Sequence, residues 1–338
     1  MNAAAKPFDG ENKYIRITDI DEASSTYNDK DLVSPDGALT DNYVVNNRDI
    51  LLARTGASTG KSYLYRKSDG KLYYAGFLIR ANVPKHNPYF VFSQLHTHRY
   101  WRWVSIMSAR SGQPGINSQE YSSFPIFTTS LQEENKISAL LSLLDARIAT
   151  QNKIIEKLES LIKGIAHTVA GMGKPNVRIS ECLECTSSTL QESDVSEVGT
   201  YPVYGANGIV GYLNGYNTSD EAIYIIKDGS GVGSVSYVKG KCSATGTLNI
   251  LTAKQDYSLQ FLYYILKVFS FVPYKTGMAI PHIYFKDYGK AHIFCPSYSE
   301  QLKYAKFLST IDDKLLVEQN VLINLSLQKQ YLLRQMFI

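Results

Sequence analysis

The sequence has no long hydrophobic run, and its charges nearly balance. No stretch of the 338 residues approaches the roughly 18 consecutive apolar residues that a membrane-spanning helix needs. The opening residues MNAAAKPFDGEN contain no signal-peptide hydrophobic core. We therefore expect a cytoplasmic protein that does not enter a membrane. The formal net charge of +4 is too small to identify a nucleic-acid binder by charge alone.

Cysteine is scarce, and its spacing favours neither a metal site nor disulfides. The four residues are Cys182, Cys185, Cys242 and Cys295. Cys182 and Cys185 have the C-x-x-C spacing, but a zinc site needs a second pair, and the other two cysteines stand alone. Free, partly buried thiols in a reducing compartment are the expectation.

Catalytic motifs are also missing. The sequence contains no Asp-Pro-Pro-Tyr or Asn-Pro-Pro-Tyr methyltransferase motif and no helicase or nuclease signature. The segment from Gly56 to Ser62 has three residues between its glycines, where a nucleotide-binding P-loop has four. We expect a chain that is not an enzyme and that binds no metal or cofactor itself.

The most informative feature that is present is an internal repeat. Residues 126–148 resemble residues 293–315, with each matched position shifted by 167, as from 126 to 293. Upstream, Gly56 and Gly60 align with Gly229 and Gly233 at a shift of 173, so the intervening loops differ in length. A period this long indicates a duplicated domain rather than a solenoid, whose units are about 20 to 50 residues. A duplicated domain suggests a duplicated or two-fold-related target.

Each copy ends in a predicted long helix. Apolar residues recur at alternating steps of four and three from Gln132 to about Ala170, which predicts a coiled coil. The first seam contains Ile137, Leu141, Leu144, Ile148, Gln151, Ile155 and Leu158, and the second contains Leu308, Ile311, Leu315, Glu318, Leu322 and Leu325. We interpret the helices as one antiparallel pair, each about 55 to 60 Å long, that acts as a spacer. The alternative is that each helix packs on its own globule.

Short strand-like runs between turns predict a mainly β core in each copy. In the first copy these runs are at 14–17, 50–53, 72–74 and 77–79, and in the second at 201–204, 222–226, 234–238 and 248–251. Short helices are expected at 88–107 and 259–269. The predicted fold is α+β, with globules at 1–130 and 173–297 and helices at 131–172 and 298–338. The two copies form a pseudo-two-fold repeat.

These features together resemble the specificity subunit of bacterial type I restriction-modification systems. The resemblance covers nearly the whole chain. It depends on the segments at 49–56, 111–117 and 201–211 and on the two helix openings that begin at Ser130 and Ser297. One departure concerns the first globule, which begins almost at its 14–19 strand and is expected to lack an opening segment of roughly 20 residues that the second globule has. That departure leaves open whether the first globule reads DNA normally.

The resemblance implies a division of labour. Each globule would be a target-recognition domain that reads one half of a split, asymmetric site in double-stranded DNA, while the helices set the spacer and dock the modification subunits. Two modification subunits would methylate adenine with S-adenosylmethionine, and restriction subunits, the motor-nucleases, would use ATP and magnesium. None of that chemistry is expected in this chain.

Candidate DNA contacts follow the loops in which the copies correspond. Arg and Lys can pair with guanine, Asn and Gln with adenine, and loop cations can hold phosphates. The candidates are Arg54, Ser58, Lys61, Arg110, Gln113 and Asn117 in the first copy, and Lys227, Ser230, Ser234, Lys275 and His282 in the second. Each of them could equally be an ordinary solvated surface residue.

Two other functions remain open from the sequence. The chain could be a two-headed adaptor that grips partner proteins, and it would then lack the salt-sensitive DNA affinity that phosphate contacts produce. It could also be an orphan hydrolase or a nucleotide-binding enzyme, if the loop from Gly56 to Ser62 bound a nucleotide.

Overall fold

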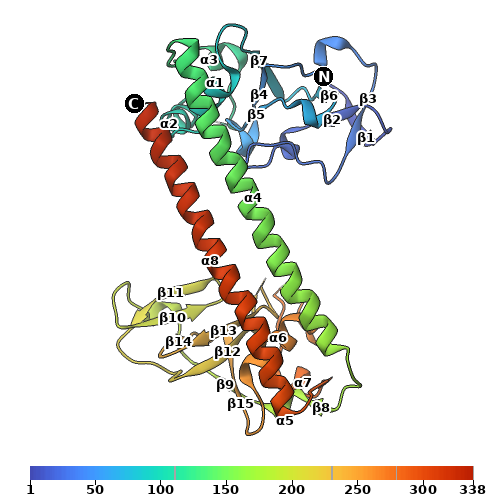
Figure 1. Cartoon of the computed structure of the whole chain (residues 1–338), viewed down its shortest axis with the longest axis vertical. Helices are drawn as coiled ribbons and strands as arrows, with labels where there is room; N and C mark the ends of the chain where they lie inside the picture. The colour runs from blue at the N-terminus through green and yellow to red at the C-terminus, as the bar shows by residue number, and fades with distance from the viewer. Residues whose placement is uncertain (110–111, 230, 279, 338) are drawn as a thin grey trace. The chain divides into compact units, whose positions relative to one another are not determined.

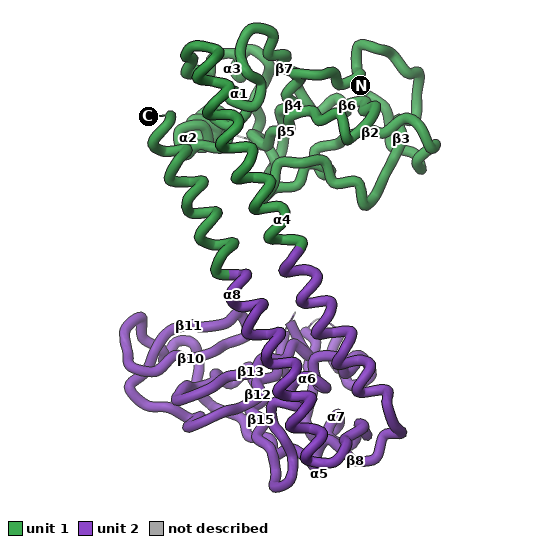
Figure 2. The backbone as a smooth tube through the Cα atoms, viewed as in Figure 1, with its two compact units in different colours: residues 1–153, 320–338 green, residues 154–319 purple. Residues whose placement is uncertain are grey.

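The computed structural model describes residues 1–109, 112–229, 231–278 and 280–337. The chain divides into two compact units, Met1–Lys153 with Asn320–Ile338, and Ile154–Gln319 (Figure 2). Each unit contains a mainly β globule and a stretch of both long helices (Figure 1). The fold is α+β and internally repeated, as the sequence predicts. No helix among the described residues is long and apolar enough to cross a membrane.

Among its described residues, the first globule contains three small sheets and three α-helices. In the central sheet, β4 (Asp49–Ala53) lies between β5 (Ser62–Leu64) and β7 (Leu78–Asn82), and both pairings are antiparallel. The smaller sheets pair β2 (Lys13–Ile15) with β6 (Leu72–Tyr74) and β1 (Ala4–Pro7) with β3 (Val33–Asp36). The helices are α1 (Pro88–Gln94), α2 (His98–Met107) and α3 (Ser118–Ser122). The predicted helix at 88–107 is therefore two helices, since Thr97 caps a new one by accepting from the Tyr100 N–H.

The second globule repeats the central sheet and extends it by one strand. Its order is β13 (Val235–Lys239), β12 (Glu221–Ile226), β15 (Leu248–Ala253) and β9 (Leu183–Ser187), all antiparallel. A second sheet contains β11 (Gly208–Leu213), β10 (Tyr201–Gly205) and β14 (Ser243–Ala244), and a third pairs β8 (Val177–Arg178) with β16 (His292–Ile293). The helices are α5 (Ile179–Cys182), α6 (Leu259–Val268) and α7 (Phe285–Tyr288).

The two central strands explain the apolar runs of the sequence. Successive strand residues point to opposite faces of a sheet. In β4, Ile50 and Leu52 join one hydrophobic cluster, while Leu51 and Ala53 join another. In β12, the Ile223 side chain joins one cluster and that of Tyr224 joins the opposite one. Both strands are buried on both faces, so an almost continuous apolar sequence replaces the alternating pattern of a half-exposed strand.

The long helices are α4 (Leu131–Ala170) and α8 (Tyr298–Met336). In the first unit, Leu141 of α4 packs with Leu333 of α8 and with Phe90 of α1. Nearby, Asp145 forms an ion pair with Lys329 at 2.6 Å. From Leu141 to Asp145 the residue number rises along α4, while that of the partner in α8 falls from Leu333 to Lys329. The two helices are therefore antiparallel within this unit.

The second unit shows the same arrangement. Ile162 and Ala166 of α4 cluster with Leu308 and Leu315 of α8, and Tyr264 of α6 joins them. Every predicted seam residue is buried or half-buried, including the polar Gln151 and Glu318. The helices therefore pair with each other and also pack on the globules, so each of the two alternatives from the sequence describes part of the packing.

Candidate nucleic-acid interface

In the second globule, a glycine loop leaves the end of β12 and is fixed to a distant segment of the chain. The Gly229 N–H donates to the Pro281 carbonyl at 3.0 Å, and the Ile283 N–H donates to the Lys227 carbonyl at 2.9 Å. Gly229 and Gly233 have φ of +96° and +91°, a conformation that other residues adopt only with strain. The loop from Lys227 to Ser234 is thus held at both ends by backbone geometry.

The first globule holds its glycine loop in the same way. The Gly56 N–H donates to the Pro114 carbonyl at 2.9 Å, and the Ile116 N–H donates to the Arg54 carbonyl at 2.9 Å. Gly56 and Gly60 have φ of +76° and +94°. The repeat seen in the sequence is therefore a repeat of backbone hydrogen bonds, which fixes two equivalent platforms with different side chains.

The loop of the first globule is poorly suited to hold a phosphate. Several of its backbone N–H groups already have acceptors, since Thr59 donates to the Gly56 carbonyl and Lys61 to the Ser58 carbonyl, both at 3.0 Å. The Gly60 N–H donates to the Ala53 carbonyl and also lies 3.1 Å from the Tyr121 hydroxyl. A P-loop binds phosphate through free backbone N–H groups. The geometry gives the nucleotide-binding interpretation no support.

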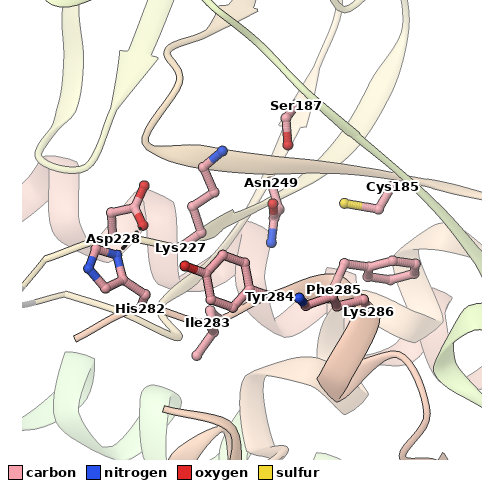
Figure 3. A pocket seen from close by; sticks show the side chains of 10 residues that line it. All are labelled: Cys185, Ser187, Lys227, Asp228, Asn249, His282, Ile283, Tyr284, Phe285 and Lys286. Atoms are coloured by element: carbon pink, nitrogen blue, oxygen red, sulfur yellow. Dashed lines mark hydrogen bonds and ion pairs between the residues drawn. The ribbon is translucent and has the colours of Figure 1, made fainter. Parts of the chain in front are cut away.

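A pocket of about 530 Å³ opens beside the loop of the second globule (Figure 3). Its lining residues come from β9, β15, the glycine loop and the segment that enters α7. They are Cys185, Ser187, Lys227, Asp228, Asn249, His282, Ile283, Tyr284, Phe285 and Lys286. The lining combines cations, an anion, hydroxyls and an amide, which suits a polar ligand with both hydrogen-bond donors and acceptors.

Asp228 and His282 form the closest polar contact in this pocket. The His282 Nδ1 lies 2.6 Å from the Asp228 Oδ1, and the two backbones also pair as an isolated antiparallel bridge. The carboxylate therefore orients the imidazole ring. Figure 3 shows the Lys227 side chain extending away from this pair and the Tyr284 hydroxyl directed toward it. Lys286 lies over the Tyr284 ring, 5.2 Å from its centroid.

The corresponding place in the first globule has different chemistry. Thr55 pairs with Gly115 in the backbone bridge that matches Asp228 with His282. Arg54 is exposed, and so is Gln113, whose amide nitrogen would lie 3.1 Å from a Cβ built on Gly56. Arg54 and Gln113 are thus both exposed, and their contact with bases stays a prediction.

The other predicted DNA contacts differ in exposure and in whether they already have a partner within the protein. Ser58 is half-buried, while Ser234 and Lys275 are exposed. Lys61 already forms an ion pair with Glu22 at 3.0 Å, and Asn117 caps α3 by accepting from the Glu120 N–H at 2.9 Å. Arg110 and Ser230 lie outside the described residues. Lys61 and Asn117 consequently have structural roles that compete with DNA contact.

Sequence reasoning missed Asp228, Tyr284 and Lys286. Asp228 is an anion, which candidate contacts chosen for their affinity for phosphates and bases do not include, although it aligns with the uncharged Thr55 of the first copy. Tyr284 and Lys286 gave no signal, because their place beside the loop depends on the pairing of residues 281–283 with that loop. Among the described residues, no three His, Cys, Asp or Glu side chains gather as a metal site.

A comparison with known protein families matches both copies of the internal repeat. The family model for the type I restriction modification DNA specificity domain matches residues 1–160 and again residues 175–326. The chain belongs to this family. Specificity subunits of type I systems are not catalytic, and this membership confirms the prediction that the chain is not an enzyme.

Two curated relatives match parts of the chain. A type I restriction enzyme specificity subunit of Haemophilus influenzae is 32% identical over 89 residues, which cover 25% of this chain and 23% of that protein. The EcoprrI specificity subunit of Escherichia coli is 25% identical over 112 residues, which cover 33% of this chain and 28% of that protein. The aligned stretches thus span about a quarter of the length of these relatives.

Two solved structures share the fold. The S subunit of a type I restriction-modification system from M. genitalium superposes with a TM-score of 0.67 at 18% identity, covering 99% of this chain and 90% of that one. A chain from a structure on complex assembly and conformational transition of the type I R-M system has a TM-score of 0.54 at 15% identity, covering 96% of this chain and 90% of that one. These matches confirm the predicted fold class.

Proposed function

We propose that the chain is the DNA specificity subunit of a type I restriction-modification complex, in which each globule reads one half of a bipartite, asymmetric site in double-stranded DNA. The observation that carries this proposal is the pair of equivalent loop platforms inside the two matched family domains. Both platforms have the same backbone hydrogen bonds, and their side chains differ. A repeated scaffold with different side chains suits two half-sites of unrelated sequence.

The side chains support an asymmetric site. The first platform presents Arg54, Thr55 and Gln113, whereas the second presents Lys227, Asp228 and His282. An arginine and a glutamine match the acceptor groups of guanine and the mixed edge of adenine. A lysine, a carboxylate and an imidazole offer a different pattern of donors and acceptors, so the two half-sites should differ in base sequence.

The long helices would set the spacer and dock the modification subunits. Large apolar side chains are exposed on them, and exposed apolar patches mark interaction surfaces. Leu140 of α4 is 47% exposed and Phe307 of α8 is 56% exposed, and the two occupy the same position in the repeat, 167 residues apart. Equivalent surfaces in the two copies would accept two copies of one partner.

The chemistry of the complex would belong to other chains. Two modification subunits would methylate adenine with S-adenosylmethionine, and restriction subunits with ATP and magnesium would translocate and cleave DNA. The specificity chain would supply affinity and position for them. Its own contribution is differential binding of one DNA sequence over the others.

The test is single-molecule sequencing of adenine methylation in a methylation-deficient host. The chain is expressed with its neighbouring modification subunit, beside a strain that lacks the chain. A new methylated motif, split by a spacer of undefined bases, is expected. A complex that assembles without any new motif would refute the function, and failure to assemble would favour the protein adaptor instead.

Charge variants sharpen this test. Arg54→Gln should alter the half-site read by the first globule and leave the other half-site intact, while Lys227→Gln should do the reverse. Lys239→Gln, which removes an exposed lysine of β13 that is not a candidate DNA contact, is the matched control. Changes in both half-sites from one substitution would contradict the assignment of one half-site to each globule.

A further inference from the structure

Asp228 is an anion on a surface that is otherwise suited to DNA. Its neighbours in the pocket include Lys227 and Lys286, whose charges attract phosphate. A carboxylate at this place weakens phosphate binding, so phosphate binding does not explain why Asp228 is there. The Asp228 side chain is 36% exposed and that of His282 is 35% exposed, so both can reach a ligand.

We propose, on the basis of the function proposed above, that Asp228 and His282 form a specificity-determining pair in the second globule and that they recognise a C·G base pair in the major groove. Asp228 accepts a hydrogen bond from the cytosine N4 amino group. His282 holds the carboxylate in place.

The geometry restricts how this pair can bind. With the Asp228 Oδ1 next to the His282 Nδ1 at 2.6 Å, the Oδ2 is the carboxylate oxygen left for a base. The backbone bridge between the two residues and the Gly229 to Pro281 hydrogen bond fix the backbone positions from which both side chains extend. A fixed acceptor loses little conformational entropy on binding, which favours discrimination between bases.

The chemistry of the base edges selects cytosine. In the major groove, cytosine presents only the N4 donor, whereas guanine presents two acceptors and thymine presents an acceptor and a methyl group. Adenine presents the N6 donor beside the N7 acceptor, which repels a carboxylate. An acceptor that cannot donate therefore prefers cytosine.

The first globule provides an internal comparison. Thr55 and Gly115 occupy the positions of Asp228 and His282 in its backbone bridge, so this globule has no such acceptor pair. Its half-site should therefore keep its sequence when Asp228 is changed. That independence separates a local change in base reading from a general loss of folding or assembly.

The experiment compares Asp228→Asn with the unchanged chain in the complete modification complex. Methylation is measured over a set of duplexes in which each base pair of the second half-site is substituted in turn. An amide can donate as well as accept, so one C·G position should lose about tenfold or more of its discrimination and gain tolerance of A·T. His282→Asn should weaken the preference at the same position, because the carboxylate loses its orienting partner.

The outcomes separate the two levels of the proposal. If the unchanged chain directs no bipartite motif, the proposed function itself fails. If it directs one and Asp228→Asn keeps the same discrimination at every C·G position, only the assignment of Asp228 is overturned. Should Asp228→Asn methylate too slowly to measure, relative binding of the complex to the same duplexes decides between these results.

Discussion

The backbone N–H of Asn87, which caps α1, donates to the Glu134 carboxylate of α4 at 2.8 Å. The second copy has the same link, in which the Ser258 N–H at the start of α6 donates to the Gln301 side chain of α8 at 2.9 Å. Glu134 and Gln301 are 167 residues apart and both are buried. A single buried acceptor on each long helix therefore fixes the first helix after the central sheet in each globule.

Removing this acceptor should destabilise the first unit strongly. Glu134 also receives the Thr129 N–H, and its carboxylate lies 2.8 Å from the His86 Nδ1, so Glu134→Ala would remove one buried acceptor from three half-buried or exposed partners. We expect a loss of about 2 kcal/mol in the free energy of unfolding, measured by urea denaturation.

The second copy suggests the matched control. Glu134→Gln copies the residue that Gln301 provides and keeps an acceptor for the Asn87 N–H, so it should cost less than half as much as alanine. Gln301→Ala should lower the stability of the second unit instead. Equal costs for the alanine and glutamine variants of Glu134 would show that the hydrogen bond to Asn87 does not hold the helix.

The glycine loop allows a second test of geometry. Gly229 and Gly233 have nearly equal positive φ, but a Cβ at Gly229 meets nothing within 4 Å, whereas one at Gly233 lies 3.0 Å from the Phe271 Cβ. Gly229→Ala should cost about 1 to 2 kcal/mol for backbone strain alone. Gly233→Ala should cost clearly more, because Phe271 is buried and its Cβ cannot move without the backbone.

Thermal unfolding of both variants measures this difference. Gly229→Ala should still direct methylation, since the loop keeps its hydrogen bonds at both ends. An alanine at Gly233 that cost no more than one at Gly229 would show that the loop does not need its close approach to Phe271.

His96 should make the first unit sensitive to acid. Burial, with a smaller effect from Lys329, lowers the pKa of His96 to about 4 from its usual 6.5. Both ring nitrogens already have partners, the Phe92 carbonyl and the Ser25 hydroxyl, each at 3.0 Å. In the unfolded chain His96 is therefore protonated below about pH 6.5, whereas in the folded chain it stays neutral down to about pH 4.

The stability contributed by neutral His96 is therefore complete above pH 6.5 and declines as the pH falls toward 4. We expect the first unit to lose about 1 to 2 kcal/mol between pH 7 and pH 5 from this residue. His96→Gln removes the titration, so its stability should change less over that range. The same pH slope in the variant and the unchanged chain would assign the acid sensitivity to other groups.

The central strands, the glycine loops and the helical seam could all be predicted from the sequence. Each depends on local periodicity or on alignment of the two copies, and both are visible in one chain. Strands such as β9 and β16 could not be predicted, because their pairing with β15 and β8 depends on residues far away along the chain. The break between α1 and α2 was also missed, since it depends on the cap at Thr97.

The candidate site was predictable only in its backbone. The aligned glycines located both platforms, and Lys227 and His282 were named as contacts. The sequence could not predict which of these side chains already have a partner within the protein, as Lys61 has in its ion pair with Glu22. Those partners come from segments that no repeat or periodicity connects to the loop.

The exposed apolar positions on the long helices provide the last test. Leu140→Glu and Phe307→Glu each place a charge on an exposed side chain, so neither should lower the stability of the chain by more than about 0.5 kcal/mol. If modification subunits dock at these two equivalent places, each single variant should bind one subunit fewer, and the double variant should bind none. Analytical ultracentrifugation of the mixtures gives the mass of each complex.

Exposed Lys153→Glu, on the same helix as Leu140, is the charge control. Full assembly by the double variant would show that the modification subunits dock elsewhere, because a buried glutamate in an apolar interface costs several kcal/mol.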